Sequence, residues 1–148
     1  MGGLTAGAYP LDRNAAANRL GTMRISVDQL DAAGTLDRAR LARDPASGLV
    51  VERVLALLAG LAFEINRQAA AALGEAPESP AAAFGAAVRA GLIDERLAAA
   101  LTPPDGPHHL LVQLYLDTEP EWVAGVVADA VAGYREYVRQ VPAGLDIA

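Results

Sequence analysis

The stretch that decides the fold is residues 47–73, SGLVVERVLALLAGLAFEINRQAAAAL. Its apolar side chains recur at helical spacing and cover most of the circumference of the predicted helix. A helix that is apolar nearly all round lies in the middle of a bundle or in an oligomer interface. Gly74 follows as a stop signal, so we expect one long central helix from Ser47 to Leu73.

The composition of the chain agrees with a helical fold. At 148 residues it has the size of one domain and can bury one substantial core. Hydrophobic residues make up 53% of it, but alanine contributes heavily and there are only two Phe, four Tyr and one Trp. Alanine-rich chains with few aromatic residues favour closely packed helices over sheets of bulky strands.

Further helices are predicted on both sides of this stretch. The segment from about Leu11 to Ala33 has one apolar face, and Gly34 is a plausible stop. That face consists of Ala16, Leu20, Met23, Val27 and Leu30. A short connecting helix is expected over residues 35–43, ending before Pro45.

The second half of the chain carries clear start and stop signals. Ser79 followed by Pro80 is a helix start, and that helix is expected to run to Gly91. Asp94 is expected to cap a short helix that ends at Leu101. Another helix is predicted over residues 107–116, after a proline-rich break. The capping box at residues 118–121 opens the last helix, which Pro142 is expected to stop.

These elements predict an all-α fold, an antiparallel four-helix bundle with short connecting helices. A flexible tail is expected over residues 1–10, a single domain over 11–141 and a second tail over 142–148. The core should be mainly Leu, Val and Ala. On the last helix, Tyr134 is expected at the edge of the core and Tyr137 at the surface.

The cytoplasm is the expected location. There is no cysteine, so disulfides and thiolate metal sites are excluded, and the N-terminus lacks the pattern of a secretory signal. The most apolar stretch, Leu49 to Leu61, is interrupted by Glu52 and Arg53 and is expected to be too short to span a membrane. No histidine or carboxylate set has metal-ligand spacing and no glycine-rich phosphate loop appears, so neither a metal nor a cofactor is expected.

Tight RNA binding is not expected either. The net charge is −6, and no Lys or Arg occurs between Arg96 and Arg135. A surface that grips nucleic acid needs basic groups to replace the phosphate counterions.

The order of segments from Val50 onward resembles the HepT-like branch of the HEPN superfamily. Four blocks carry the resemblance: residues 51–55 (VERVL), 62–66 (AFEIN), 90–94 (AGLID) and 106–117 (GPHHLLVQLYLD). The resemblance, taken from Val50 onward, covers about two-thirds of the chain. The resemblance implies a helical bundle, a homodimer and a toxin–antitoxin setting, in which the partner is a nucleotidyltransferase antitoxin that modifies a tyrosine of the toxin.

The resemblance also implies a site, because active members of the family carry a ribonuclease motif of Arg, four residues, His, one residue and Tyr. In this chain the three motif positions hold His108, Gln113 and Tyr115, so only the tyrosine is retained. RNA cleavage through the 2′-hydroxyl needs a group that exchanges a proton near neutral pH and a cation beside the phosphate. Gln113 cannot titrate, and His108 lacks the permanent charge and the donor fork of arginine. We therefore expect a pseudo-ribonuclease that acts as a scaffold or regulator.

Two other functions remain open. An active ribonuclease could use His108 and Tyr115 across a dimer cleft, with a lesser contribution from His109. Adjacent histidines point about 100° apart on a helix, so the two do not converge on one phosphate. The chain could also be an unrelated helical interaction domain. Glu64 lies where the family often places an acidic residue near the motif, and we interpret it as a carboxylate paired with arginine or a helix N-terminus.

Overall fold

The computed structural model describes residues 12–102 and 120–147. Within these ranges the regular structure is entirely helical, which confirms the predicted all-α class. The helices are α1 (Arg13–Ala32), α2 (Arg38–Arg43), α3 (Ala46–Ala72), α4 (Pro80–Arg89), α5 (Glu95–Leu101) and α7 (Pro120–Gly144). The predicted helix over residues 107–116 lies outside the described residues.

Polar side chains cap the helices where the sequence predicts them. The hydroxyl of Ser79 accepts a hydrogen bond from the backbone amide of Ala82 at 3.1 Å and so opens α4, with Pro80 at its first position. The carboxylate of Asp94 accepts one from the amide of Leu97 at 2.7 Å and opens α5. Each cap satisfies an amide that has no partner inside its own helix.

Three glycines lie where helices end or the chain turns. Gly34, Gly74 and Gly91 have φ angles of 76°, 78° and 78°. This left-handed conformation is strained for residues that carry a Cβ atom, so glycine favours a stop here. The predicted stops at Gly34 and Gly74 are therefore confirmed. Gly91 follows α4, which ends at Arg89.

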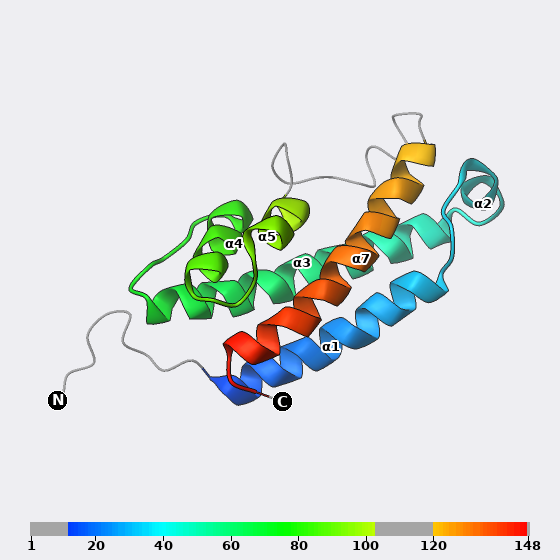
Figure 1. The fold of residues 1–148 in the computed structure, drawn as a ribbon. Coiled ribbons are helices and arrows are strands. Elements are labelled where there is room, and N and C mark those ends of the chain that lie inside the picture. The colour runs from blue at the N-terminus through cyan, green and yellow to red at the C-terminus, as the bar shows by residue number, and fades with distance from the viewer. Residues whose placement is uncertain (1–11, 103–119, 148) are drawn as a thin grey trace.

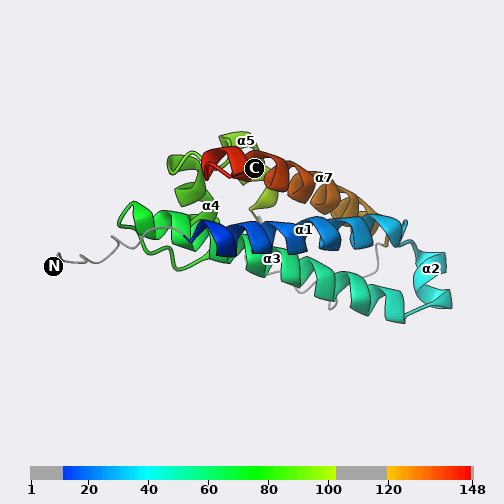
Figure 2. The same ribbon diagram turned by 90° about the horizontal axis from the view of Figure 1, so that it is seen from below.

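The three long helices lie side by side in alternating directions. Helix α1 packs against both α3 and α7 and runs antiparallel to each of them (Figures 1 and 2). The short helix α2 makes the connection at one end, and α4 and α5 cover the other end of α3 and α7. This arrangement leaves α3 at the edge of the described helices in Figure 2.

The core lies where the inward faces of α1, α3, α4 and α7 meet. The predicted face of α1 is buried throughout: Ala16, Leu20, Met23, Val27 and Leu30 are at most 2% exposed. From α3 the core receives Val51, Leu58, Ala62 and Ile65, and from α7 it receives Val127, Val131, Tyr134, Tyr137, Val138 and Val141. The core is therefore mainly Leu, Val and Ala, as predicted, with tyrosine added from α7.

Arginines join α1 to α7 along their length. The guanidinium of Arg135 lies 3.1 Å from a carboxylate oxygen of Asp28 and 3.2 Å from one of Asp31. At the other end, Arg13 Nε donates a 2.8 Å hydrogen bond to the carbonyl oxygen of Leu145. Since the ion pairs are exposed, each contributes little to stability, and the buried apolar faces of α1 and α7 hold the two helices together.

The prediction that Pro142 ends the last helix is wrong. Helix α7 continues through Pro142 to Gly144, and Leu145 is buried, so residues 142–145 belong to the folded body rather than to a tail. A proline inside a helix leaves the carbonyl four residues earlier without its amide donor. Here that carbonyl belongs to Val138, and Arg24 Nη2 from α1 lies 3.5 Å from its oxygen, which partly replaces the lost donor.

The prediction that the apolar stretch is too short to span a membrane does not hold for the whole helix. Helix α3 has 27 residues and by length and composition alone could cross a membrane. The central helix of a soluble bundle meets the same criteria, and α3 packs one side against α1 and α4. Because α3 is apolar nearly all round, the side that faces away from α1 and α4 is apolar as well.

Candidate functional site

The structure describes one of the five predicted site residues. His108, His109, Gln113 and Tyr115 lie outside the described residues, so their arrangement stays a prediction. Glu64 is described and lies on α3. Among the described residues, the candidate site therefore consists of Glu64 and the surface of α3 next to it.

Glu64 is an ionised carboxylate held by an arginine one turn later. Its Oε2 atom accepts a 2.8 Å hydrogen bond from Arg67 Nη2, and 38% of the side chain is exposed. This hydrogen bond is the main cause that lowers the pKa of Glu64, and the charges of Arg67 and Arg19 add to it. The interpretation of Glu64 as an arginine-paired carboxylate is confirmed. It is suited to attract a cation rather than to donate a proton near neutral pH.

A row of exposed residues precedes Glu64 on α3 and forms what we name the outward face of α3. It consists of Ala46, Leu49, Val50, Arg53, Ala56, Leu57 and Gly60. Leu49 is 52% exposed, Val50 60% and Leu57 46%, although each is large and apolar. The outward side of a helix in a soluble monomer is ordinarily polar, and continuous apolar patches mark interaction sites.

The outward face is open at its C-terminal end. A Cβ atom built on Gly60 would meet no other atom within 4 Å. Arg53 is the only charged residue of the face and makes no ion pair with another residue that the structure describes. The surface is therefore a four-turn apolar strip with a small gap at Gly60 and one cation.

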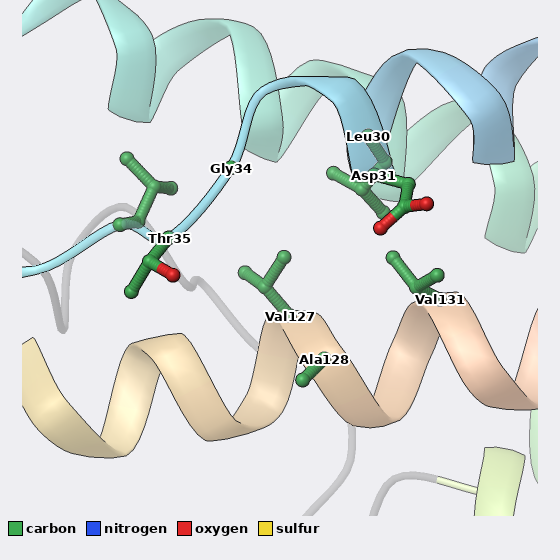
Figure 3. A pocket seen from close by; sticks show the side chains of 8 residues that line it. Leu30, Asp31, Gly34, Thr35, Val127, Ala128 and Val131 are labelled. Atoms are coloured by element: carbon green, nitrogen blue, oxygen red, sulfur yellow. The ribbon is translucent and has the colours of Figure 1, made fainter.

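A shallow pocket of about 250 Å³ lies between the C-terminal end of α1, the loop after it and α7 (Figure 3). It is lined by Leu30, Asp31, Gly34, Thr35, Leu36, Val127, Ala128 and Val131. Its carboxylate is already engaged, because Asp31 binds Arg135 at 3.2 Å. In Figure 3, Val127 points from α7 toward the loop, and Val131 points toward Asp31 at the end of α1. The lining can receive an aliphatic group, but it offers no acid–base pair.

The prediction that Tyr137 lies at the surface is wrong. Tyr137 is 0% exposed, and its hydroxyl donates a 2.7 Å hydrogen bond to Oδ1 of Asn66, which is also fully buried. Burial raises the pKa of Tyr137 well above 10, and it raises that of Tyr134 to about 12, so both phenols are neutral at physiological pH. The helical spacing of Tyr134, Tyr137 and Val141 places them on one face and was the signal for burial.

Among the described residues, no three His, Asp or Glu side chains lie close enough together to hold a metal ion. Both histidines of the chain lie at positions 108 and 109, outside those residues. The described part of the chain offers an exposed apolar face on α3 and, one turn beyond it, the arginine-paired carboxylate of Glu64.

We compared the chain with known protein families, curated proteins and solved structures. No family model matches the chain, and no curated protein or solved structure matches it either.

Proposed function

We propose that this protein is a HepT-like helical bundle that forms a homodimer and acts as a scaffold or regulator without cleaving RNA. The observation that carries the proposal is the outward face of α3, which leaves Leu49, Val50 and Leu57 about half exposed. Full burial of a large aliphatic side chain stabilises a folded or associated state by about 1.5–3 kcal/mol. Covering three half-exposed side chains on each of two copies is then a substantial driving force for association.

The four-helix architecture of the family is part of the proposal. The three long helices α1, α3 and α7 already alternate in direction, as the helices of such a bundle do. The helix predicted over residues 107–116 bears the motif positions and precedes α7 in the sequence, in the order that the resemblance implies.

The loss of ribonuclease activity follows from the residues at the motif positions. Gln113 stands where the family has its proton-exchanging histidine, and His108 stands where it has its arginine. A glutamine side chain has no titratable proton, so it cannot act as a general acid or base. The stretch between Arg96 and Arg135 also lacks any lysine or arginine that could neutralise a phosphate backbone.

The retained tyrosine points to a protein partner. Tyr115 is the one motif residue that matches the family, in which a nucleotidyltransferase antitoxin modifies a tyrosine of the toxin. A member without nuclease activity can still present this tyrosine and bind the antitoxin. This is the regulatory role that we propose.

The experiment that tests the proposal combines RNA cleavage with sedimentation. We expect no cleavage of a generic RNA by the wild-type protein or by a His108→Ala variant, and a dimer at tens of micromolar protein. Cleavage by the wild type that disappears in His108→Ala would establish an active ribonuclease instead. A strict monomer would refute the homodimer.

A gain-of-function variant tests the resemblance itself. The double substitution His108→Arg with Gln113→His restores the family motif, so we expect it to cleave the same RNA. The single substitution Leu114→Ala in the same segment, which changes no motif position, is the matched control and should stay inactive. If the double variant is folded, dimeric and inactive, the unrelated interaction domain becomes the better explanation.

A further inference from the structure

The line of residues from Arg53 along the outward face of α3 leads past Gly60 to Glu64, which lies one turn beyond the face. Arg53 and Glu64 are eleven positions apart, which turns the helix by three full turns and only about 20° more. Leu57 and Gly60 lie between them, within about 40° of the same line. The strip therefore presents, in order, a cation, a large apolar residue, a gap and an anion.

The four positions share a single centre. The midpoint between Arg53 and Glu64 along the helix is also the midpoint between Leu57 and Gly60. A two-fold axis through this midpoint, perpendicular to the helix, brings a second α3 alongside in the antiparallel direction. It then places each Arg53 opposite a Glu64 and each Leu57 opposite a Gly60, in an isologous contact.

The side chains suit this placement. Arg53 has no ion-pair partner among the described residues. The hydrogen bond from Arg67 lowers the pKa of Glu64, whose side chain is 38% exposed. The space beside Gly60 is open, with no atom within 4 Å of a Cβ atom built there. A leucine from a neighbouring helix can enter such a gap and bring the two backbones close together.

Other arrangements of two α3 helices are less favourable. A parallel pair places each Arg53 opposite its own copy, and like charges repel. An antiparallel pair shifted by three residues places Arg53 opposite Arg67, with the same consequence. Of these three arrangements, the one centred between Leu57 and Gly60 pairs opposite charges and fills the gap. It also lays the aliphatic stems of Arg67 and Gln68 over Val50 and Leu49.

We infer that two copies of this chain associate through the outward faces of α3 in antiparallel orientation, with Leu57 packed over the partner's Gly60 and Arg53 paired with the partner's Glu64. The inference rests on the homodimer of the proposed function and specifies which surface and which register form it. The dimer has two equivalent ion pairs about 16 Å apart, and the apolar contacts of Leu57 with Gly60 lie between them.

A charge exchange tests the register. We expect Arg53→Glu alone and Glu64→Arg alone to weaken the dimer about tenfold or more in sedimentation equilibrium, because each places two like-charged pairs in the interface. The double variant exchanges the charges and should return the dissociation constant to near the wild-type value. A recovered dissociation constant cannot come from a contact within one chain, because positions 53 and 64 lie about 16 Å apart along the helix.

Matched control variants separate the interface from general charge effects. Arg96→Glu on α5 and Glu78→Arg before α4 make the same reversals at exposed positions away from α3. We expect neither to change the dissociation constant by more than about twofold. Thermal unfolding of every variant shows whether the fold is intact. Equal weakening by the controls would overturn the inference.

Cross-linking tests the orientation directly, because the chain has no cysteine of its own. Arg53→Cys and Glu64→Cys chains are prepared separately and mixed with a short bismaleimide. In a mixed dimer, the cysteine at position 53 of one chain faces the cysteine at position 64 of the other. At the opposite end of the interface, Glu64 of the first chain still pairs with Arg53 of the second. We expect cross-linked dimer from the mixture and almost none from either variant alone.

The outcomes distinguish this inference from the proposed function. Cross-linking by Arg53→Cys alone would show a parallel or shifted pair and overturn the antiparallel register. A wild-type dimer that resists both charge reversals and gives no cross-link would place the interface elsewhere, leaving the proposed homodimer standing and this inference refuted. A monomeric wild type would refute both.

Discussion

The hydroxyl of Tyr137 on α7 donates a 2.7 Å hydrogen bond to the side-chain oxygen of Asn66 on α3, and neither residue is exposed to solvent. The ring of Phe84 from α4 stands edge-on to that of Tyr137, with 6.5 Å between centroids and planes at 87°. Three helices therefore meet at one polar contact inside an apolar core. Such a contact stabilises the fold only while both partners remain, because a buried polar atom without a partner is costly.

Removal of the Tyr137 hydroxyl is expected to destabilise the protein. Tyr137→Phe leaves Oδ1 of Asn66 without its donor, so we expect the free energy of unfolding to fall by about 1–3 kcal/mol. Tyr134→Phe is the matched control, because no hydrogen bond of its hydroxyl is seen among the described residues and its loss should be much smaller. Urea denaturation of both variants measures the difference. Equal losses would mean that the hydrogen bond makes no special contribution.

Two glycines of α7 should respond to alanine in opposite directions. A Cβ atom at Gly144 would lie 2.6 Å from the carbonyl oxygen of Gly91 and 2.9 Å from Cα of Leu92, so the backbone must shift. We expect Gly144→Ala to destabilise the protein by about 1–3 kcal/mol. A Cβ atom at Gly125 meets nothing within 4 Å, and Gly125→Ala should stabilise it by about 0.5–1 kcal/mol. Denaturation midpoints that move in the same direction would contradict this account.

Glu136 should titrate at an unusually acidic pH. Arg139 donates to both of its carboxylate oxygens and Gln140 Nε2 donates at 2.7 Å, and these hydrogen bonds lower the pKa of Glu136 to about 2. A carboxylate with a lowered pKa adds stability above its unfolded pKa of about 4.3, and this contribution is lost as the pH falls through about 2.

NMR titration of the Glu136 carboxylate tests this assignment. Arg139→Gln removes the larger cause and should raise the pKa of Glu136 toward about 4.3. Arg89→Gln removes a comparable exposed arginine from Glu75 and should leave the pKa of Glu136 unchanged. A Glu136 pKa that stays near 2 without Arg139 would refute the assignment.

Asp94 is expected to contribute to stability through two helices. Its carboxylate caps α5 through the amide of Leu97 and accepts a 3.0 Å hydrogen bond from Gln140 on α7. Asp94→Ala should therefore lower the free energy of unfolding by about 1–2 kcal/mol. Asp94→Asn keeps the capping oxygen and should cost much less. Thermal unfolding compares the two, and equal melting temperatures would exclude the cap as the cause.

Local signals in the sequence predicted most of the helix boundaries. Helix α3 was expected over residues 47–73 and spans 46–72, because Gly74 takes a left-handed conformation just after it. Ser79 and Asp94 cap the helices that they were expected to cap. The prediction at Pro142 is wrong because the donor that replaces its missing amide belongs to Arg24. That residue lies 118 positions earlier, and no local pattern in the sequence indicates the contact.

The candidate site was less predictable for a physical reason. Because α3 is apolar nearly all round, its sequence could not show which side the bundle would bury, and that depends on where α1 and α4 pack. The ion pair of Glu64 with Arg67 could be expected, since residues three apart on a helix are neighbours. The motif positions at His108, Gln113 and Tyr115 lie outside the described residues and stay predictions.

The hydrogen bond from Arg13 to the carbonyl oxygen of Leu145 also has a topological consequence. It holds the beginning of α1 beside the end of α7 (Figure 1), so a short peptide could join residue 12 to residue 147 without moving any helix. Opening the resulting ring between Gly74 and Ser79 would give a circular permutant in which α4 comes first and α3 last. The same helices would pack in the same places although their order along the backbone had changed.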